Sequence, residues 1–444
     1  MKAPWSNAAE PIVSRRVQWA IFGLALTLRA GLVLTQHFWH LFFGGSLGAG
    51  DQRLYAMLAE NIARGQGMVV SGSLAWGSPS GYPFALGPTA WVTPGYPLFL
   101  AACRLVFGDS VFAVELVQSV LGAATAVVLA HVTAAVFGAR AGAIGGFIAA
   151  CYVELALSAF GLATEPLYTF VLSLALLATL RAVSAAGLVG YVAAGALFGT
   201  AALVRATAFP VALVLAGMLP LCAAQPSGWA RSGRAAVFAG ACVLVLLPWG
   251  VRNHVAMGRF MLMSSEGGYV LWLGNNPEYD RMASDLGRFG GYGPVASFGP
   301  VLGRLPEAAG LSEMESYAVY RGAAIAHITE HPERIPRRIF HKMWNMWRPM
   351  HSTASWRQQI VAGISYPVLI LLSGVGFLGF LRRRTAWPLH VFLILSVALL
   401  AVGIGAIRYR VPLWTALIPF AAGTVDAAWS AWDRVGRRHR GQPG

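Results

Sequence analysis

Residues 111–137 read VFAVELVQSVLGAATAVVLAHVTAAVF, a run in which Glu115 is the only Asp, Glu, Lys or Arg. A helix that crosses a membrane needs roughly 17–25 predominantly apolar residues, so this run predicts a transmembrane helix. Further apolar runs meet the same requirement at 17–37, 141–160, 164–182, 187–204, 206–224, 235–251, 359–381, 386–406 and 411–430. The sequence therefore predicts an all-α polytopic membrane protein with about ten transmembrane helices.

The composition supports this prediction and raises a question about charge. Of the 444 residues, 57% are apolar and 11% are charged, whereas a soluble domain has about 25% charged residues. With 33 basic and 18 acidic residues the net charge is +15, a balance that is also common in nucleic-acid-binding proteins. A nucleic-acid groove needs a solvated basic face, which a mostly lipid-facing chain lacks. We therefore expect no nucleic-acid partner.

The positions of the basic residues account for about half of the positive charge. Basic residues precede the first predicted span and follow the second, fourth, sixth, eighth and tenth, which is the positive-inside pattern for a chain with both ends in the cytoplasm. They are Lys2, Arg15, Arg16, Arg140, Arg181, Arg231, Arg234, Arg382, Arg383, Arg384, Arg434, Arg437, Arg438 and Arg440. We expect a multi-pass plasma membrane protein of the bacterial inner-membrane type, with the first span as a retained signal anchor.

In this topology two long connections, at 38–110 and 252–358, lie on the extracytoplasmic side. The chain then divides into an N-terminal membrane module with seven spans at 1–251, the second long loop, and a C-terminal module with three spans and a basic cytoplasmic tail at 359–444. Within the second loop, 312–331 has the pattern of an amphipathic helix. Because the cytoplasmic connections are short, we expect the chemistry on the outer face.

Ionisable side chains at membrane depth are costly and usually face a cavity or a partner. Those near the predicted span ends are Arg29, Asp51, Glu115, Glu154, Glu165, Arg205, Arg252, Arg408 and Arg410. Most fall at the outer ends of their spans, so we expect them to gather near one plane, at the mouth of an outward-facing cavity.

Asp51 begins a short amphipathic segment in the first long loop. Leu54, Leu58 and Ile62 recur at helical spacing, and Gly65 is a typical helix stop. Two interpretations of Asp51 remain open, and they are compatible. It caps this helix, or it presents a carboxylate at the membrane surface as a general base.

The other charged residues at span ends also allow two interpretations. Thr164 and Glu165 form a normal helix start with a cap and an acidic first turn, yet Glu165 also lies on the same predicted face as Asp51. Arg252 and Arg408 could extend to lipid headgroups. Arginines on the outer side go against the positive-inside rule, however, so they also suggest an anionic ligand such as a lipid phosphate.

The chain resembles the polyprenyl-phosphate-sugar-dependent glycosyltransferases of the GT-C fold, in the branch of the protein O-mannosyltransferases and the lipid A aminoarabinose transferase. The matching segments occur in the family's order. They are Gly50-Asp51…Tyr55, Thr93-Pro94-Gly95-Tyr96-Pro97, Thr164-Glu165-Pro166, Pro248-Trp249…Arg252-Asn253, Gly274-Asn275-Asn276-Pro277 and Arg408-Tyr409-Arg410-Val411-Pro412. The spacing of the spans agrees, with one long loop after the first and another after the seventh.

The resemblance implies an inverting membrane glycosyltransferase with an extracytoplasmic active site. Asp51 matches the family's catalytic acid in the first loop, and Glu165 matches the second acid, expected to orient the acceptor or an arginine. Arg252 is the first candidate for stabilising the phosphate of the leaving group. The further phosphate candidates are Arg205, Arg408, Arg410 and Arg53, and the candidates for the acceptor or sugar site are Tyr55, Tyr96, Asn253 and Asn275.

The same resemblance implies the partners: a polyprenyl-phosphate-linked sugar as donor, a lipid, envelope glycan or protein hydroxyl as acceptor, and the bilayer. Gln52 follows Asp51, so there is no adjacent acidic pair to bind a divalent ion, and we expect no obligatory metal although one is possible. The alternative function is a transporter or flippase of a lipid-linked sugar. Such a protein often shows paired halves, and no internal repeat is evident here.

Overall fold

The computed structural model describes residues 13–39, 51–71, 86–185, 187–222, 228–284, 305–308, 310–349 and 356–439. These residues are almost entirely helical, and their one sheet pairs β1 (Val69–Val70) with β2 (Gly87–Pro88) in antiparallel register. The prediction of an all-α membrane protein is confirmed.

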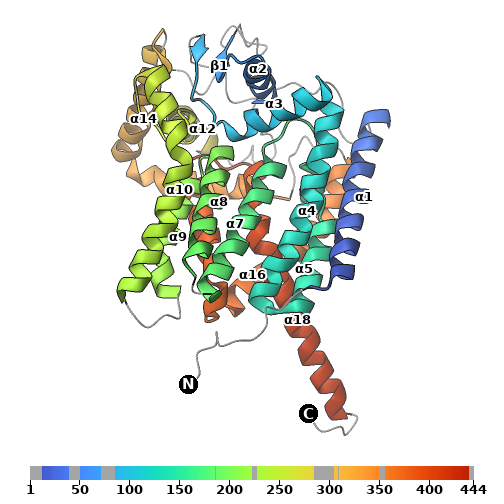
Figure 1. The fold of residues 1–444 in the computed structure, drawn as a ribbon. Helices are drawn as coiled ribbons and strands as arrows, with labels where there is room; N and C mark the ends of the chain where they lie inside the picture. The colour runs from blue at the N-terminus through green and yellow to red at the C-terminus, as the bar shows by residue number, and fades with distance from the viewer. Residues whose placement is uncertain are drawn as a thin grey trace.

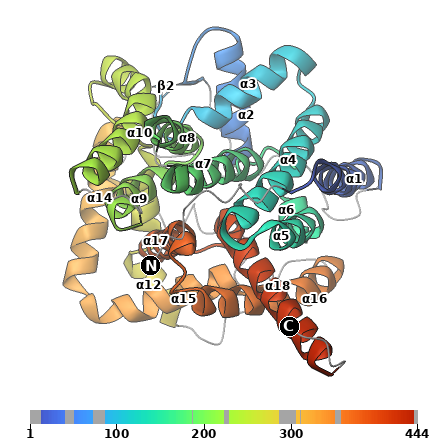
Figure 2. The same ribbon diagram turned by 60° about the horizontal axis from the view of Figure 1, so that its bottom comes forward.

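The body of the molecule is a bundle of apolar helices, most of them long (Figure 1). They are α1 (Arg15–Trp39), α4 (Val111–Phe137), α5 (Ala139–Cys151), α6 (Val153–Leu157), α7 (Glu165–Ala185), α8 (Leu188–Val204), α9 (Ala208–Cys222), α10 (Gly228–Met257), α16 (Trp356–Gly379), α17 (Trp387–Val402) and α18 (Trp414–His439). Figure 2 shows α7 between α4 and α8 and places α1 at the edge of the bundle.

Six helices of the described residues are long and apolar enough to cross a membrane. The remaining apolar helices of the bundle are shorter, so the number ten stays a prediction. The predicted span at 141–160 is not one helix, because α5 ends and α6 begins on either side of Tyr152, which is extended. The guanidinium of Arg29 accounts for this break, since it binds the carbonyls of Ala149 and Ala150 at 3.0 and 2.9 Å.

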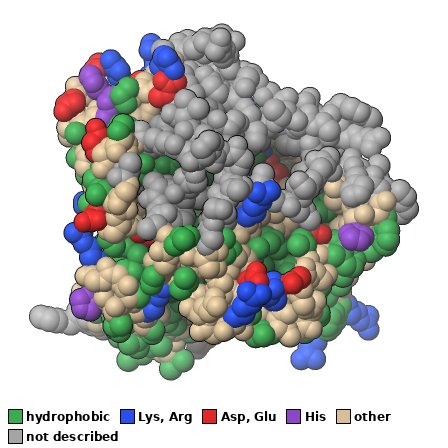
Figure 3. Space-filling model, turned by 90° about the horizontal axis from the view of Figure 1, so that it is seen from above, with side chains coloured by type: hydrophobic (Ala, Val, Ile, Leu, Met, Phe, Trp, Pro, Cys, Tyr) green, Lys and Arg blue, Asp and Glu red, His purple; other side chains and the backbone are tan. Residues whose placement is uncertain are grey.

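Shorter helices gather at one end of the bundle, which we call the loop face (top of Figure 1). They are α2 (Asp51–Ala63), α3 (Gly95–Phe107), α11 (Glu266–Leu273), α12 (Pro277–Ser284), α14 (Glu313–Glu330) and α15 (Ile335–Trp347), with the 3-10 turns η3 (Pro306–Ala308) and η4 (Pro332–Arg334). Seen from above, acidic, basic and apolar side chains lie together on this face (Figure 3). The C-terminal part of α18 extends beyond the opposite end.

Local signals explain where the loop-face helices begin and end. Helix α2 starts at Asp51, and the chain leaves it through Gly65, whose φ of +76° is in the left-handed region that favours glycine. Helix α14 is held at its start by Ser312 and Glu315, whose side chains each bond the other's backbone N–H as a capping box. Both helices were predicted. Helix α3, which follows the Pro-rich turn at 93–97, was not assigned as a helix from the sequence.

Glycines let the bundle helices pack at very close range. A Cβ on Gly195 of α8 would lie 2.1 Å from the carbonyl oxygen of Phe238 on α10, and one on Gly376 of α16 would lie 2.3 Å from that of Phe420 on α18. Small residues at helix crossings are typical of membrane bundles, where packing replaces the hydrophobic effect as the force between helices.

Candidate functional site

The site forms where α2 meets η6 (Ile407–Leu413), a 3-10 segment that leads into α18. Arg408 Nη2 donates to Asp51 Oδ2 at 2.7 Å. The side chain of Asp51 is 24% exposed and that of Arg408 is 53% exposed, so a ligand can reach both. The structure thus brings together two residues that were predicted as a carboxylate base and a phosphate ligand.

A second ion pair lies next to the first. Arg205, at the end of α8, donates to Glu165 Oε1 at 2.9 Å, and Glu165 is buried at the start of α7. The Tyr409 ring links the two pairs, because its centre is 5.1 Å from the Arg205 guanidinium carbon and 5.3 Å from that of Arg408. Cations over an aromatic face are attracted by its quadrupole.

Glu266 adds a third carboxylate that sequence analysis missed. It begins α11 and is partly buried. Burial, followed by the negative charge of Asp51, raises the pKa of Glu266 to about 7, while Arg408 and Arg205 oppose this shift. We refer to Asp51, Glu165, Arg205, Glu266 and Arg408 as the acid–arginine cluster.

Tyr55 and Tyr96 stand behind the cluster. Their ring centres are 5.0 Å apart in an edge-to-face arrangement. Burial and the charge of Asp51 raise the pKa of Tyr55 well above its usual value, so its hydroxyl stays protonated. The hydroxyl of Tyr96 is fully buried and donates to Gln118 Oε1 at 2.9 Å. Tyr55 therefore belongs to the surroundings of the cluster, whereas Tyr96 supports it from behind.

Buried polar groups of α4 fix the turn that precedes Glu165. Gln118 Nε2 donates to the carbonyls of Ala159 and Gly161 at 3.0 and 2.8 Å. Glu115 Oε1 accepts from the N–H of Gly161 at 2.7 Å. Glu115, one of the charged residues singled out in the sequence, thus positions the turn and does not join the cluster.

Arg410 lies two residues from Arg408 but has a different environment. It is fully buried and pairs with Glu154, while its Nη1 donates to the carbonyls of Met346 and Arg348 at 2.9 and 2.6 Å. All of these partners belong to the protein. The structure does not bring Arg410 into the acid–arginine cluster.

Arg252 also lies apart from the cluster. Its Nη1 donates to the carbonyl of Thr89 at 2.8 Å and its Nη2 to that of Met68 at 2.6 Å, so it binds the β1–β2 region of the first loop. Asn253 is fully buried and donates to the carbonyl of Met261 at 2.9 Å. Both residues tie the end of α10 to the loops beside it.

The two remaining predicted site residues differ in exposure. Arg53 is exposed on α2, two residues after Asp51. Asn275 is buried, and its Nδ2 donates to the carbonyls of Leu271 and Val402 at 2.8 and 2.9 Å. Asn275 holds the end of α11 against the end of α17.

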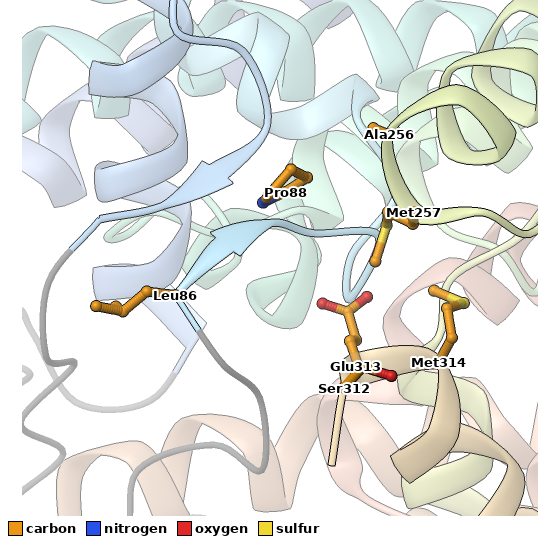
Figure 4. A pocket seen from close by; sticks show the side chains of 7 residues that line it. All are labelled: Leu86, Pro88, Ala256, Met257, Ser312, Glu313 and Met314. Atoms are coloured by element: carbon orange, nitrogen blue, oxygen red, sulfur yellow. The ribbon is translucent and has the colours of Figure 1, made fainter. Parts of the chain in front are cut away.

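Glu313 joins the two long loops. Its carboxylate accepts from Thr89 Oγ1 at 2.6 Å, from the N–H of Ala90 at 2.8 Å and from Ser265 Oγ at 2.6 Å. Ser265 directly precedes Glu266, so this buried carboxylate fixes the start of α11 next to the first loop. In Figure 4 the Glu313 side chain rises from α14 into a cavity of about 190 Å³. The residues lining it are Leu86, Pro88, Ala256, Met257, Ser312, Glu313 and Met314.

Among the described residues, no three His, Cys, Asp or Glu side chains are placed to hold a metal ion. Asp51, Glu165 and Glu266 each have arginine as the neighbouring cation. The expectation that no metal is obligatory stays a prediction.

Comparison with known proteins identifies the fold. Residues 91–251 match the family model described as dolichyl-phosphate-mannose-protein mannosyltransferase. The archaeal oligosaccharyltransferase AglB from Archaeoglobus fulgidus, in complex with an inhibitory peptide and a dolichol-phosphate, superposes with a TM-score of 0.57 at 15% identity, covering 96% of this chain and 52% of AglB. The apo form of the same enzyme superposes with a TM-score of 0.56 at 15% identity and with the same coverage of both chains. This chain thus spans about half the length of AglB.

ArnT from Cupriavidus metallidurans bound to undecaprenyl phosphate gives a TM-score of 0.43 at 15% identity, covering 95% of this chain and 80% of ArnT. No curated protein sequence matches the chain significantly. The superposition on AglB shows that the chain has the GT-C fold, as predicted.

Proposed function

We propose that this chain, whose fold is that of the GT-C glycosyltransferases, moves a sugar from a polyprenyl monophosphate to a hydroxyl of an envelope acceptor. The observation that carries the proposal is the acid–arginine cluster, where Arg408 pairs with the accessible carboxylate of Asp51 and Arg205 pairs with Glu165. The match to the mannosyltransferase family model and the dolichol-phosphate in the AglB complex support a lipid-linked donor.

In the proposed reaction Asp51 accepts the proton of the acceptor hydroxyl as its oxygen attacks the anomeric carbon of the sugar. The bond between that carbon and the phosphate oxygen breaks, and its electron pair leaves with the polyprenyl phosphate. Attack from the side opposite the leaving group inverts the anomeric configuration. Glu266 lies beside Asp51 and has a pKa of about 7. Its carboxylate, when ionised, helps to bind the acceptor hydroxyl.

The leaving phosphate gains negative charge, which needs a cation placed in advance. We propose Arg408 for this role, with Arg205 beside it, because Arg408 is exposed and lies next to Asp51. Arg408 takes the place of Arg252 as first candidate, since the Arg252 guanidinium already binds two backbone carbonyls of the first loop. A donor phosphate that binds Arg408 competes with the Asp51 carboxylate for this guanidinium.

The proposal includes a location. The loop face is extracytoplasmic, and both termini are cytoplasmic. The basic segment Arg382–Arg384, which lies between α16 and α17, and the basic residues near the end of α18 support this orientation through the positive-inside rule. The donor would reach the cluster from the membrane and the acceptor from the loop face.

The test is release of polyprenyl phosphate by purified protein in vesicles. Radiolabelled hexosyl, pentosyl and aminosugar polyprenyl phosphates are supplied in turn, with Asp51→Asn as the test variant and Glu330→Gln, on the exposed end of α14, as its control. We expect release with at least one donor, loss in Asp51→Asn and no change in Glu330→Gln. Full activity of Asp51→Asn would refute the mechanism, and movement of intact donor across the membrane without release would favour a flippase.

The phosphate assignment is tested by donor binding. We expect Arg408→Ala to weaken binding of the donor much more than Arg252→Ala does, because only Arg408 lies in the acid–arginine cluster. If Arg252→Ala weakens donor binding more than Arg408→Ala does, Arg252 is the phosphate ligand.

A further inference from the structure

Helix α15 buries two of its basic side chains and exposes several of its large apolar ones. Two of its basic residues, Arg338 and Lys342, face the protein interior, and Lys342 is only 1% exposed. Three of its large apolar side chains face outward, with Ile339 39%, Phe340 60% and Trp344 49% exposed. Met346 is buried, and Met343 and Trp347 pack against the core. A surface helix of a soluble protein shows the opposite arrangement, so the surroundings of the outer side of α15 are not simply water.

The inward polar contacts fix this orientation. Arg338 forms a bidentate ion pair with the Asp280 carboxylate, in which Nη2 lies 2.8 Å from Oδ2. Lys342 Nζ donates to Asn275 Oδ1 at 3.2 Å and to the carbonyl of Val402 at 2.9 Å. Rotating the helix to expose its cations would break these buried charge-assisted hydrogen bonds, each a strong interaction.

The position of α15 along the bundle indicates what its outer side meets. Val402 is the last residue of α17, and the carbonyl of Met346 on α15 accepts from Arg410 just before α18. Helix α15 therefore lies level with the ends of two bundle helices at the loop face. The side chain of Val402 is itself 55% exposed, so the apolar surface of α17 continues toward α15.

We propose that α15 lies in the boundary layer of the membrane at the loop face, with Ile339, Phe340 and Trp344 among lipid acyl chains. Trp is favoured at this depth, and a helix with strong amphipathicity binds there through its buried apolar area. The exposed Arg337 lies beside the apolar side chains and reaches the lipid phosphates. This inference concerns the membrane contact and stands apart from the proposed function.

The experiment uses nitroxide spin labels on the full-length protein in vesicles of phosphatidylethanolamine and phosphatidylglycerol. Labels are placed at Phe340→Cys and Trp344→Cys, with Arg321→Cys on the exposed side of α14 as the control. Wild-type protein treated in the same way gives the background from the native cysteines. Oxygen, which concentrates in acyl chains, and a water-soluble nickel chelate are the two relaxation probes.

We expect the ratio of oxygen to nickel accessibility to be several-fold higher at the α15 labels than at Arg321→Cys. Equal or greater nickel accessibility at Phe340→Cys would overturn the proposal, because water would then cover this side. Protection from both probes would overturn it as well, since a partner protein or a second copy of the chain would then cover the helix. Because Phe340 is exposed, its replacement leaves the fold intact.

Discussion

Glu266 is expected to set the pH range of the reaction. Burial and the charge of Asp51 raise its pKa from 4.5 to about 7. The ionised fraction then rises from about one tenth at pH 6 to about nine tenths at pH 8, by simple titration. Because the ionised carboxylate is the form that binds the acceptor hydroxyl, we expect kcat/KM to rise about tenfold over this range.

The variant Glu266→Gln removes the titrating group while it keeps the size of the side chain. Its kcat/KM should stay flat across the same range and lie below about one tenth of the wild-type value at pH 8. The assay is release of polyprenyl phosphate in vesicles buffered between about pH 5.5 and about pH 8.5. Glu330→Gln, at an exposed position of α14, is the control and should retain the wild-type profile.

Two results would refute this reasoning. If the pH profile of kcat/KM for Glu266→Gln keeps an inflection near pH 7, another group titrates there and Glu266 does not set the pH range. If the wild-type rate falls as the pH rises through 7, the protonated carboxyl is the active form and the assigned role of Glu266 is wrong.

Further substitutions test the packing that positions the site. Gly122→Ala would place a Cβ 2.6 Å from Arg29 Nε and should destabilise the protein by about 1–3 kcal/mol in thermal unfolding, whereas Gly217→Ala meets no atom within 4 Å and should not. Glu313→Ala removes the acceptor of three hydrogen bonds, so hydrogen exchange of the paired strands β1 and β2 should become faster. Arg410→Leu leaves the Glu154 carboxylate, which is 10% exposed, without its cation and should cost about 3–5 kcal/mol of stability.

Much of the fold follows from local sequence properties. The run at 111–137 corresponds to α4, because length and apolar content are sufficient to predict a bundle helix. The helix predicted at 312–331 corresponds to α14, since the capping side chains of Ser312 and Glu315 lie within one turn of each other. The break of the helix at Tyr152 could not be predicted from the local sequence, because it depends on Arg29 in another helix.

The site was only partly predictable because its partners come from distant parts of the chain. Asp51 and Glu165 stand in short motifs that mark them as candidates. Glu266 has no such motif, and its importance comes from Asp51 and the arginines that the fold places near it. Arg252 was predicted from its place at the end of a span, and the sequence contains no signal that the carbonyls of Thr89 and Met68 would bind its guanidinium.

The two arginines of η6 show most clearly what three-dimensional structure adds. A 3-10 turn advances about 120° per residue, so side chains two residues apart point to different sides. Arg410 points inward to Glu154 and to the chain that follows α15, where its hydrogen bonds fix the turn. Arg408 is thereby held at the loop face beside Asp51. A fully buried guanidinium such as that of Arg410 needs permanent partners. An exposed guanidinium such as that of Arg408 can exchange its partner for a phosphate. This difference in burial distinguishes the structural role of Arg410 from the proposed phosphate-binding role of Arg408.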